Sequence, residues 1–295
     1  MTILEQALAE QEYLTAIRRH LHQNPEIGFE EVDTTALIRR ELAAIQAEIT
    51  PLSIATGVCA MITGTKPGKG KVIALRADID ALPIQEQTGA AHASTRPGVM
   101  HACGHDIHMA SVIGTGLIMH ELRNHWAGRV ILVFESGEEQ LPGGSMAILD
   151  SAEFKLVMPD IMLGLHVLPE MEVGKVGFCA GRYMASGDEV YLTVKGKGGH
   201  AALPHTLIDP VVIASNIIIN LQTIVSRSAP ALVPTVLSFG KVEANGATNV
   251  IPNEVRIEGT FRTMDERWRD KAHSLIETKA NGIAQSMGGS CNVEI

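Results

Sequence analysis

The sequence has no excess of basic residues, few cysteines and no long unbroken apolar run. Its 295 residues include 24 Lys and Arg against 33 Asp and Glu, a formal net charge of −9. This balance argues against a general binder of nucleic acid or anionic membranes, because neutralising phosphates requires a basic face. The four cysteines have no framework spacing, which suggests a reducing compartment.

The N-terminus lacks the features of a secretory signal, since acidic residues occur early and no apolar run follows a basic start. The most apolar later stretch, Pro210–Leu221, is interrupted by Asn216 and Asn220 and is too short to span a bilayer. We therefore expect a soluble, cytoplasmic protein that binds neither nucleic acid nor a membrane.

Helical and strand patterns alternate through the first part of the chain. Hydrophobic periodicity and turn signals predict helices over 2–22, 33–47, 111–124 and 144–150, and strands over 57–63, 71–77, 129–135, 161–166 and 173–178. The wholly apolar run in 129–135 is typical of a strand buried on both faces. This alternation predicts an α/β domain with a mostly parallel sheet.

The pattern changes near Ala185. The later residues predict strands at 189–195, 235–243, 254–262 and from 291 onward, with helices at 209–226 and 265–287. The order β-α-β-β-α-β is that of a ferredoxin-like unit. We therefore predict two domains, residues 1–184 and residues 185–295.

One short segment has an unusual density of metal-binding side chains. MHACGHDIHM, Met100–Met109, contains His101, Cys103, His105, Asp106 and His108. Cysteine and histidine suit zinc, whereas histidine with carboxylate also suits manganese, cobalt or nickel. Gly104 lets the backbone turn sharply between Cys103 and His105. The alternative is a buried free cysteine beside surface histidines.

Other polar side chains follow the ends of predicted strands. These are Asp78 and Asp80, Glu138 and Glu139, and His166. Their convergence at one sheet edge would suit a metal-assisted hydrolase, in which a metal polarises a carbonyl and activates water while a separate carboxylate transfers the proton. Taken singly, a solvated glutamate pair, a structural histidine and an aspartate that caps a turn remain alternatives.

Seven segments, in order along nearly the whole chain, resemble the amidohydrolase branch of the aminoacylase/carboxypeptidase metallopeptidase family. They are HLHQNPEIGFEE, LRADIDALPIQE, GVMHACGHDIHMA, SGEEQLPGG, GLHV, GKGGHAALPH and TNVIPNEVRIEGTFR. Members of that family include hippurate hydrolases, N-acyl-amino-acid amidohydrolases and plant indole-acetyl-amino-acid hydrolases.

The resemblance implies a site for two divalent ions, zinc, manganese, cobalt or nickel. By position in the motifs, it assigns Cys103, His105, Glu139 and His166 as ligands and Glu138 as general base and acid. The implied reaction is hydrolysis of an N-acyl amino acid, such as a hippurate-like substrate, to a carboxylic acid and an amino acid.

The resemblance also assigns residues outside the ligand set. Asp80 would orient a ligand, as metal-bound imidazoles usually require. The ferredoxin-like domain would be a lid through which the protein forms a homodimer. In that lid, His200 would reach a substrate carbonyl, and Asn249 and Arg262 are candidates for the substrate carboxylate. A solvated strand residue is the alternative for Arg262.

Two features depart from the family pattern. Glu135-Ser136-Gly137 stands before the glutamate pair where Gln-Pro-Ala is usual. The family chain also returns from the lid to the first domain for roughly another hundred residues, a fraction of a domain, and supplies one more histidine ligand there. We therefore expect a catalytic domain that is incomplete at its C-terminal end.

Three interpretations follow. The leading one is a metal-dependent amidohydrolase. The second is a catalytically silent, truncated remnant that dimerises and acts as a binding protein. The third is a dipeptidase or carboxypeptidase of the same superfamily, which Cys103 disfavours because peptidase branches tend to carry aspartate as the bridging ligand.

Overall fold

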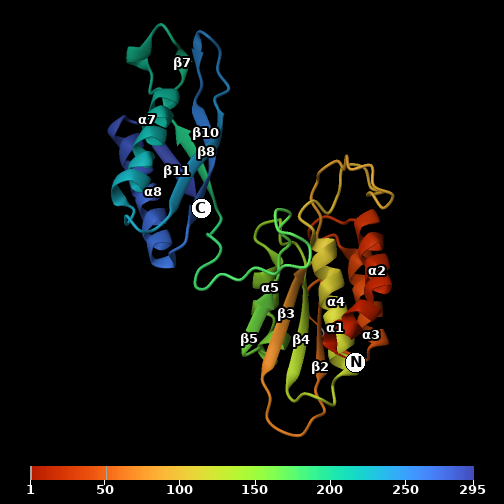
Figure 1. Cartoon of the computed structure of the whole chain (residues 1–295). Coiled ribbons are helices and arrows are strands. Elements are labelled where there is room, and N and C mark those ends of the chain that lie inside the picture. The colour runs from red at the N-terminus through yellow and green to blue at the C-terminus, as the bar shows by residue number, and fades with distance from the viewer. Residues whose placement is uncertain (1, 51) are drawn as a thin grey trace. The chain divides into compact units, whose positions relative to one another are not determined.

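The computed structural model describes residues 2–50 and 52–295 of the chain. The chain divides into two compact units, one that ends at Gly174 and one that runs from Lys175 to Ile295 (Figure 1). Between residues 165 and 187 the structure has neither helix nor strand, so the predicted strand at 173–178 is wrong. Val173 and Phe178 give that segment an apolar pattern, but both side chains are fully exposed and no strand pairs with them.

The first unit is a layered α/β structure. In chain order, its elements are α1 (Ile3–Ala9), α2 (Gln11–Gln23), α3 (Val32–Ala44), β1 (Glu48–Thr50), β2 (Val58–Thr63), β3 (Val72–Asp78), α4 (His105–Glu121), β4 (Arg129–Glu135), α5 (Gly144–Asp150), α6 (Ala152–Lys155) and β5 (Ile161–Gly164). Helices α2, α3 and α4 cover one face of the sheet, and α5 and α6 pack on the other (Figure 1).

The sheet of the first unit is mixed rather than mostly parallel. Its strand order among the described residues is β1-β2-β4-β3-β5. Strands β3, β4 and β5 run parallel, whereas β2 is antiparallel to both β1 and β4. The predicted, mostly parallel sheet is wrong because β2 runs antiparallel to both of its neighbours. Strand β4, which comes later in the chain, pairs between β2 and β3, so these two strands are adjacent in sequence but not in the sheet.

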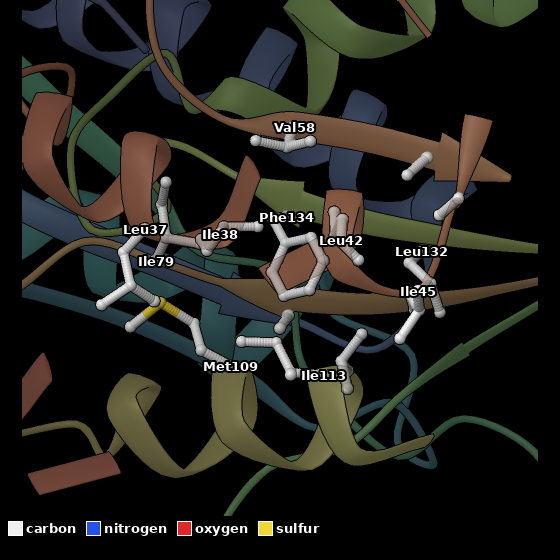
Figure 2. Close-up of a cluster of buried hydrophobic side chains, with 14 of the residues drawn as sticks. Leu37, Ile38, Leu42, Ile45, Val58, Ile79, Met109, Ile113, Leu132 and Phe134 are labelled. Carbon is white, nitrogen blue, oxygen red and sulfur yellow. The ribbon is translucent and has the colours of Figure 1, made fainter. Parts of the chain in front are cut away.

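Strand β4 forms the centre of this unit's core. Val130, Leu132 and Phe134 pack against α2, α3 and α4 on one face, where Figure 2 shows Phe134 among Ile38, Leu42 and Ile113. The alternate residues Ile131 and Val133 pack against α5 and α6 on the other face. Burial on both faces is the expected consequence of an uninterrupted apolar strand between two helical layers. This rigid strand then delivers the loop that follows Glu135.

The edge strand β5 contrasts with β4. It pairs with β3 alone, and its side chains Ile161, Met162 and Leu163 are exposed. Among the described residues, no helix of the first unit buries either face of β5. An apolar strand with an open edge is a pairing surface that folded proteins normally cover.

The second unit has the predicted β-α-β-β-α-β order. In chain order, its elements are β6 (Asp188–Lys195), β7 (Gly199–His200), η1 (Pro204–Thr206), α7 (Pro210–Thr223), η2 (Ile224–Ser228), β8 (Thr235–Glu243), β9 (Val250–Ile251), β10 (Glu254–Thr263), α8 (Glu266–Ser286) and β11 (Ser290–Glu294). The main sheet is antiparallel with the order β11-β6-β10-β8, and β7 and β9 form a separate ribbon.

Both long helices of the second unit begin at an aspartate cap. The Asp209 side chain accepts from the amides of Val211 and Val212, and the Asp265 side chain accepts from the amide of Trp268. The segment Pro210–Ser228 is long and apolar enough to cross a membrane by length and composition alone. Its buried side chains, Ile213 and Ile217 among them, belong to the core of this unit, whereas Val212 and Ile219 are exposed.

Candidate metal centre

The centre is built around the start of α4. Gly104 adopts a left-handed φ of +84° between Cys103 and His105, the first residue of the helix. A Cβ at Gly104 would lie 2.5 Å from Cγ2 of Val167. Glycine is therefore required at this position for two reasons, the backbone conformation and the close approach of Val167. The sharp turn predicted between the cysteine and the histidine is present.

Three groups of potential ligands overlap at His105. They are Cys103 with His105 and His166, His105 with Glu138 and Glu139, and Asp78 with His105 and His108. Within each group, one ligand atom per residue lies within 4.8 Å of the others. The structure thus brings Cys103 and His166, and separately Glu138 and Glu139, close to His105.

His105 is oriented from behind by Asp80. Its Nδ1 lies 2.8 Å from the Asp80 carbonyl oxygen, which can only accept, so Nδ1 carries the hydrogen. Nε2 faces three carboxylates, those of Asp78 at 3.6 Å, Glu139 at 3.8 Å and Glu138 at 3.9 Å. This nitrogen is buried without a hydrogen-bond partner among the described residues. A buried lone pair among three carboxylates is a suitable donor for a cation and is unfavourable without one.

The glutamate pair lies on a loop that is anchored at both sides. Fully buried Glu31 accepts hydrogen bonds from Ser136 Oγ at 2.7 Å and from the Gly137 amide at 2.8 Å. The Glu139 amide donates to Asp80 Oδ2 at 2.9 Å. The unusual Ser136-Gly137 sequence is therefore accommodated by Glu31, a partner that the sequence analysis did not identify.

The extra carboxylate of Glu135 is part of an ion-pair chain rather than of a ligand group. Its Oε2 accepts from Arg76 Nε at 2.7 Å, and Arg76 Nη1 donates to Asp78 Oδ2, also at 2.7 Å. Burial alone would raise the pKa of Asp78, but the hydrogen bond from His108 and the charges of His105 and Arg76 hold it below its usual value. Asp78 is thus an anionic anchor at the end of β3.

Two side chains facing His105 have raised pKa values. Burial, followed by the negative charges of Glu139 and Asp78, raises the pKa of Glu138. Burial and then Glu139 raise the pKa of the Cys103 thiol to about 12. A divalent cation would favour the thiolate, the form in which cysteine binds metals. The crowding of Glu138, Glu139 and Asp78 also fits a cation site.

Asp78 and His108 have a place in the centre that their sequence motifs did not predict. Both are fully buried, and they meet through His108 Nδ1 and Asp78 Oδ1 at 2.6 Å. The available signal was the spacing of His105 and His108, since residues three apart share a helix face.

The candidate substrate residues all lie in the second unit. His200 and Asn249 come together on the β7–β9 ribbon, where His200 pairs with Val250 and the Ala201 amide donates to the Asn249 carbonyl at 3.0 Å. Arg262 lies at the far end of β10 from this ribbon. The eight steps from Glu254 to Arg262 span roughly 26 Å at about 3.3 Å per residue. Within this unit, the fold therefore does not bring Arg262 to Asn249.

Known proteins resemble this chain over most of its length. The family model for peptidase family M20/M25/M40 matches residues 74–292. An N-acetyl-L-cysteine deacetylase of Bacillus subtilis is 42% identical over 281 residues, which cover 95% of this chain and 66% of that protein. An N-acyl-L-amino acid amidohydrolase of Geobacillus stearothermophilus is 40% identical, with 93% of this chain and 73% of that protein covered.

A solved structure of the same family also resembles this chain. Bacillus subtilis protein YXEP, described as a dinuclear metal-binding peptidase of the M20 family, superposes with a TM-score of 0.80 at 38% identity. The match covers 97% of this chain and 73% of that one. The chain thus spans about two thirds to three quarters of the length of these relatives. The family model, the relatives and the fold agree that the chain belongs to peptidase family M20/M25/M40, a family of metal-dependent hydrolases.

Proposed function

We propose that the protein hydrolyses the amide bond of N-acyl amino acids, including hippurate-like substrates, to a carboxylic acid and an amino acid. The observation that carries this proposal is the convergence of Cys103, His166 and the glutamate pair on His105, whose Nε2 has no hydrogen-bond partner among the described residues. The names of the relatives, a deacetylase of N-acetyl-L-cysteine and an amidohydrolase of N-acyl-L-amino acids, support the substrate class.

Cys103, His105, Glu139 and His166 are the proposed ligands of two divalent ions, zinc, manganese, cobalt or nickel. Sulfur, imidazole and carboxylate donors together suit these ions, whereas magnesium and calcium prefer oxygen ligands alone. When bound, such ions supply a Lewis acid and lower the pKa of water. Asp80 is the proposed positioning residue, because its carbonyl orients His105 and its carboxylate holds the amide of Glu139.

Glu138 is the proposed general base and acid. It is adjacent to Glu139, and its side chain is 40% exposed, so that substrate and water can reach it. Its carboxylate takes a proton from the attacking water as the oxygen bonds to the amide carbon. It then gives that proton to the leaving nitrogen as the C–N bond breaks. A raised pKa suits this exchange, because transfer is efficient when the pKa approaches the working pH.

We propose that the first unit is the catalytic domain and that the second is a lid through which two copies associate. His200 on the exposed ribbon would then donate to the substrate carbonyl oxygen, and Asn249 beside it would bind the substrate carboxylate. Arg262 stays a candidate for the same carboxylate only if it belongs to a different protomer from Asn249. We also propose a cytoplasmic location.

The exposed edge of β5 supports the proposal that the catalytic domain requires further polypeptide. The relatives are longer than the part that this chain matches. Further polypeptide would cover Ile161, Met162 and Leu163 and, as the family resemblance implies, add a histidine ligand. The same exposed edge favours the second candidate function, a dimerising binding protein without turnover. Metal content and catalysis separate the two candidates.

The experiment uses the purified 295-residue chain, stripped with a chelator and reloaded with zinc, manganese, cobalt or nickel. Ions per chain are measured by elemental analysis, with Cys103→Ala as the control. Release of free amine is then measured from N-acetyl and N-benzoyl amino acids and from dipeptides. We expect close to two ions, fewer in the variant, and turnover of the N-acyl amino acids. Metal binding without turnover would favour the second candidate function, a binding protein. Preferred cleavage of dipeptides would show that the protein is a peptidase.

A further inference from the structure

A second buried imidazole lies one helical turn beyond His105. His108 is fully buried, and both of its ring nitrogens have partners. Nδ1 lies 2.6 Å from Asp78 Oδ1, and Nε2 accepts the backbone amide hydrogen of Val167 at 3.0 Å. An amide N–H can only donate, so Nε2 presents its lone pair and Nδ1 carries the ring hydrogen that Asp78 accepts. The surroundings thus select one tautomer of His108.

Asp78 is itself held by the framework of the sheet. Arg76 bridges Asp78 and Glu135 with two hydrogen bonds of 2.7 Å. Asp78 and Glu135 are paired residues at the ends of the parallel strands β3 and β4. His108 is therefore anchored through Asp78 to the paired ends of two inner strands of the sheet.

Val167 connects His108 to the candidate ligand His166. The Val167 carbonyl oxygen accepts from His166 Nδ1 at 2.8 Å, which leaves His166 Nε2 facing Cys103 Sγ at 3.2 Å. The Val167 side chain packs over Gly104, between Cys103 and His105. The amide, the carbonyl and the side chain of Val167 therefore each contact a different part of the candidate centre.

The segment that carries His166 has little other support. His166 follows the end of β5, and the side chains of Leu165, His166 and Leu168 are exposed. Loop residues that must hold a ligand in place need tethers from the scaffold. Among the described residues, the bond from the Val167 amide to His108 is the backbone tether of this segment to α4.

We propose that His108 is a positioning residue: by accepting the Val167 amide hydrogen it fixes the peptide after His166, so that His166 Nε2 points toward Cys103 and His105. The role of His108 in metal binding rests on the proposed function, whereas its hydrogen bonds to Asp78 and Val167 do not. His108 is not itself a ligand in this arrangement, although it clusters with Asp78 and His105. Both of its nitrogens are engaged, so it has no free lone pair to offer.

The first test is the tautomer of His108 in the unmodified chain. Histidine-selective ¹⁵N labelling and long-range ¹⁵N–¹H correlation spectra distinguish an Nδ1–H ring from an Nε2–H ring, and the signal is assigned by its loss in His108→Asn. We expect the Nδ1–H tautomer, with and without added zinc. An Nε2–H ring would overturn the inference, because such a ring cannot accept the Val167 amide hydrogen.

The second test compares three variants by ion stoichiometry and affinity, measured without an activity assay. His108→Gln places an acceptor near the position of Nε2, His108→Asn keeps a donor near Nδ1, and His108→Leu keeps neither. We expect the Asn and Leu variants to bind zinc about 10- to 100-fold more weakly, the usual effect of losing a residue that orients a ligand. The Gln variant should lose less affinity than the Asn variant, and at saturating zinc all three should hold as many ions as the unmodified chain.

The outcomes separate this inference from the proposed function. Loss of one ion from both the Gln and the Asn variants at saturating zinc would make His108 a ligand and overturn the positioning role. Unchanged affinity in all three variants, or greater loss in Gln than in Asn, would also overturn it. If the unmodified chain bound no ion, the proposed function would fail, and the tautomer alone would decide whether His108 holds Val167.

Discussion

The two units differ in the support beneath their candidate functional residues. In the first unit, His105, Asp80 and Asp78 are almost completely buried and are held by hydrogen bonds at strand ends. In the second unit, His200 and Arg262 are exposed, and His200 lies on a two-residue strand of a small ribbon. The exposed candidate ligands His166 and Glu139 thus face a buried and hydrogen-bonded His105, which suits metal coordination because such coordination tolerates little displacement. Exposed residues on a small ribbon can instead close on a substrate.

The sharpest way to test this contrast is to remove the proton carrier while leaving the ligands. Glu138→Gln should lower the rate of hydrolysis by about 10²- to 10⁴-fold, the usual contribution of general acid–base catalysis, without changing the ions per chain. The measurements are initial rates and elemental analysis. Glu139→Gln is the matched variant and should lose metal as well as rate. Equal rates for Glu138→Gln and the unmodified enzyme would remove Glu138 from the mechanism.

The separation of the two cores predicts separate stability effects. Phe134→Ala should destabilise the first unit by about 3–5 kcal/mol, because a large buried ring leaves a cavity beside Ile38 and Leu42. Phe261→Ala should do the same to the second unit, where Phe261 is fully buried. Hydrogen exchange followed by mass spectrometry reports each unit separately. Equal loss of protection in both units for either variant would mean that they unfold together.

Removing the exposed imidazole should impair catalysis without disturbing the metal centre. His200→Ala should lower kcat/KM by on the order of 10²-fold, as for the loss of one donor to a developing oxyanion, with the metal content unchanged. His205→Ala, on the exposed turn η1, is the control and should have no effect. If the two variants behaved alike, the ribbon would have no part in the reaction.

The smallest expected effect concerns the acid stability of the second unit. Burial would raise the pKa of Asp188, but hydrogen bonds and charge from Arg269 outweigh it and hold the pKa below 3.8. Ionised Asp188 therefore stabilises the fold above pH 3.8, and this stabilisation is lost as the pH falls through the lowered value.

Asp188→Asn should accordingly destabilise the unit at pH 7 by about 1 kcal/mol, a modest figure because Arg269 is partly exposed. The difference from the unmodified chain should shrink below pH 3.8. Urea unfolding at several pH values measures it, with exposed Asp270→Asn on α8 as the control. A difference that grew on acidification would contradict the assignment.

Much of the second unit was predictable because its signals are local. Thr235–Glu243 and the helix that starts after Asp265 agree with the predicted bounds, since an alternating strand and an aspartate cap depend on neighbouring residues. The mixed sheet of the first unit was not predictable in this way. Strand order and direction depend on which strands pair across long separations, and the insertion of β4 between β2 and β3 leaves no local trace.

The sequence by itself determined the chemical character of this protein: Cys103, His105, Glu138, Glu139 and His166 occur in motifs whose donor types suit divalent metals and acid–base chemistry. Only the tertiary structure decided how these groups are held. The Arg76–Asp78–His108 chain joins a strand end, a helix and a loop that are far apart in sequence. Such hydrogen bonds depend on distance and direction in space, and these exist only after the sheet has brought its strand ends together.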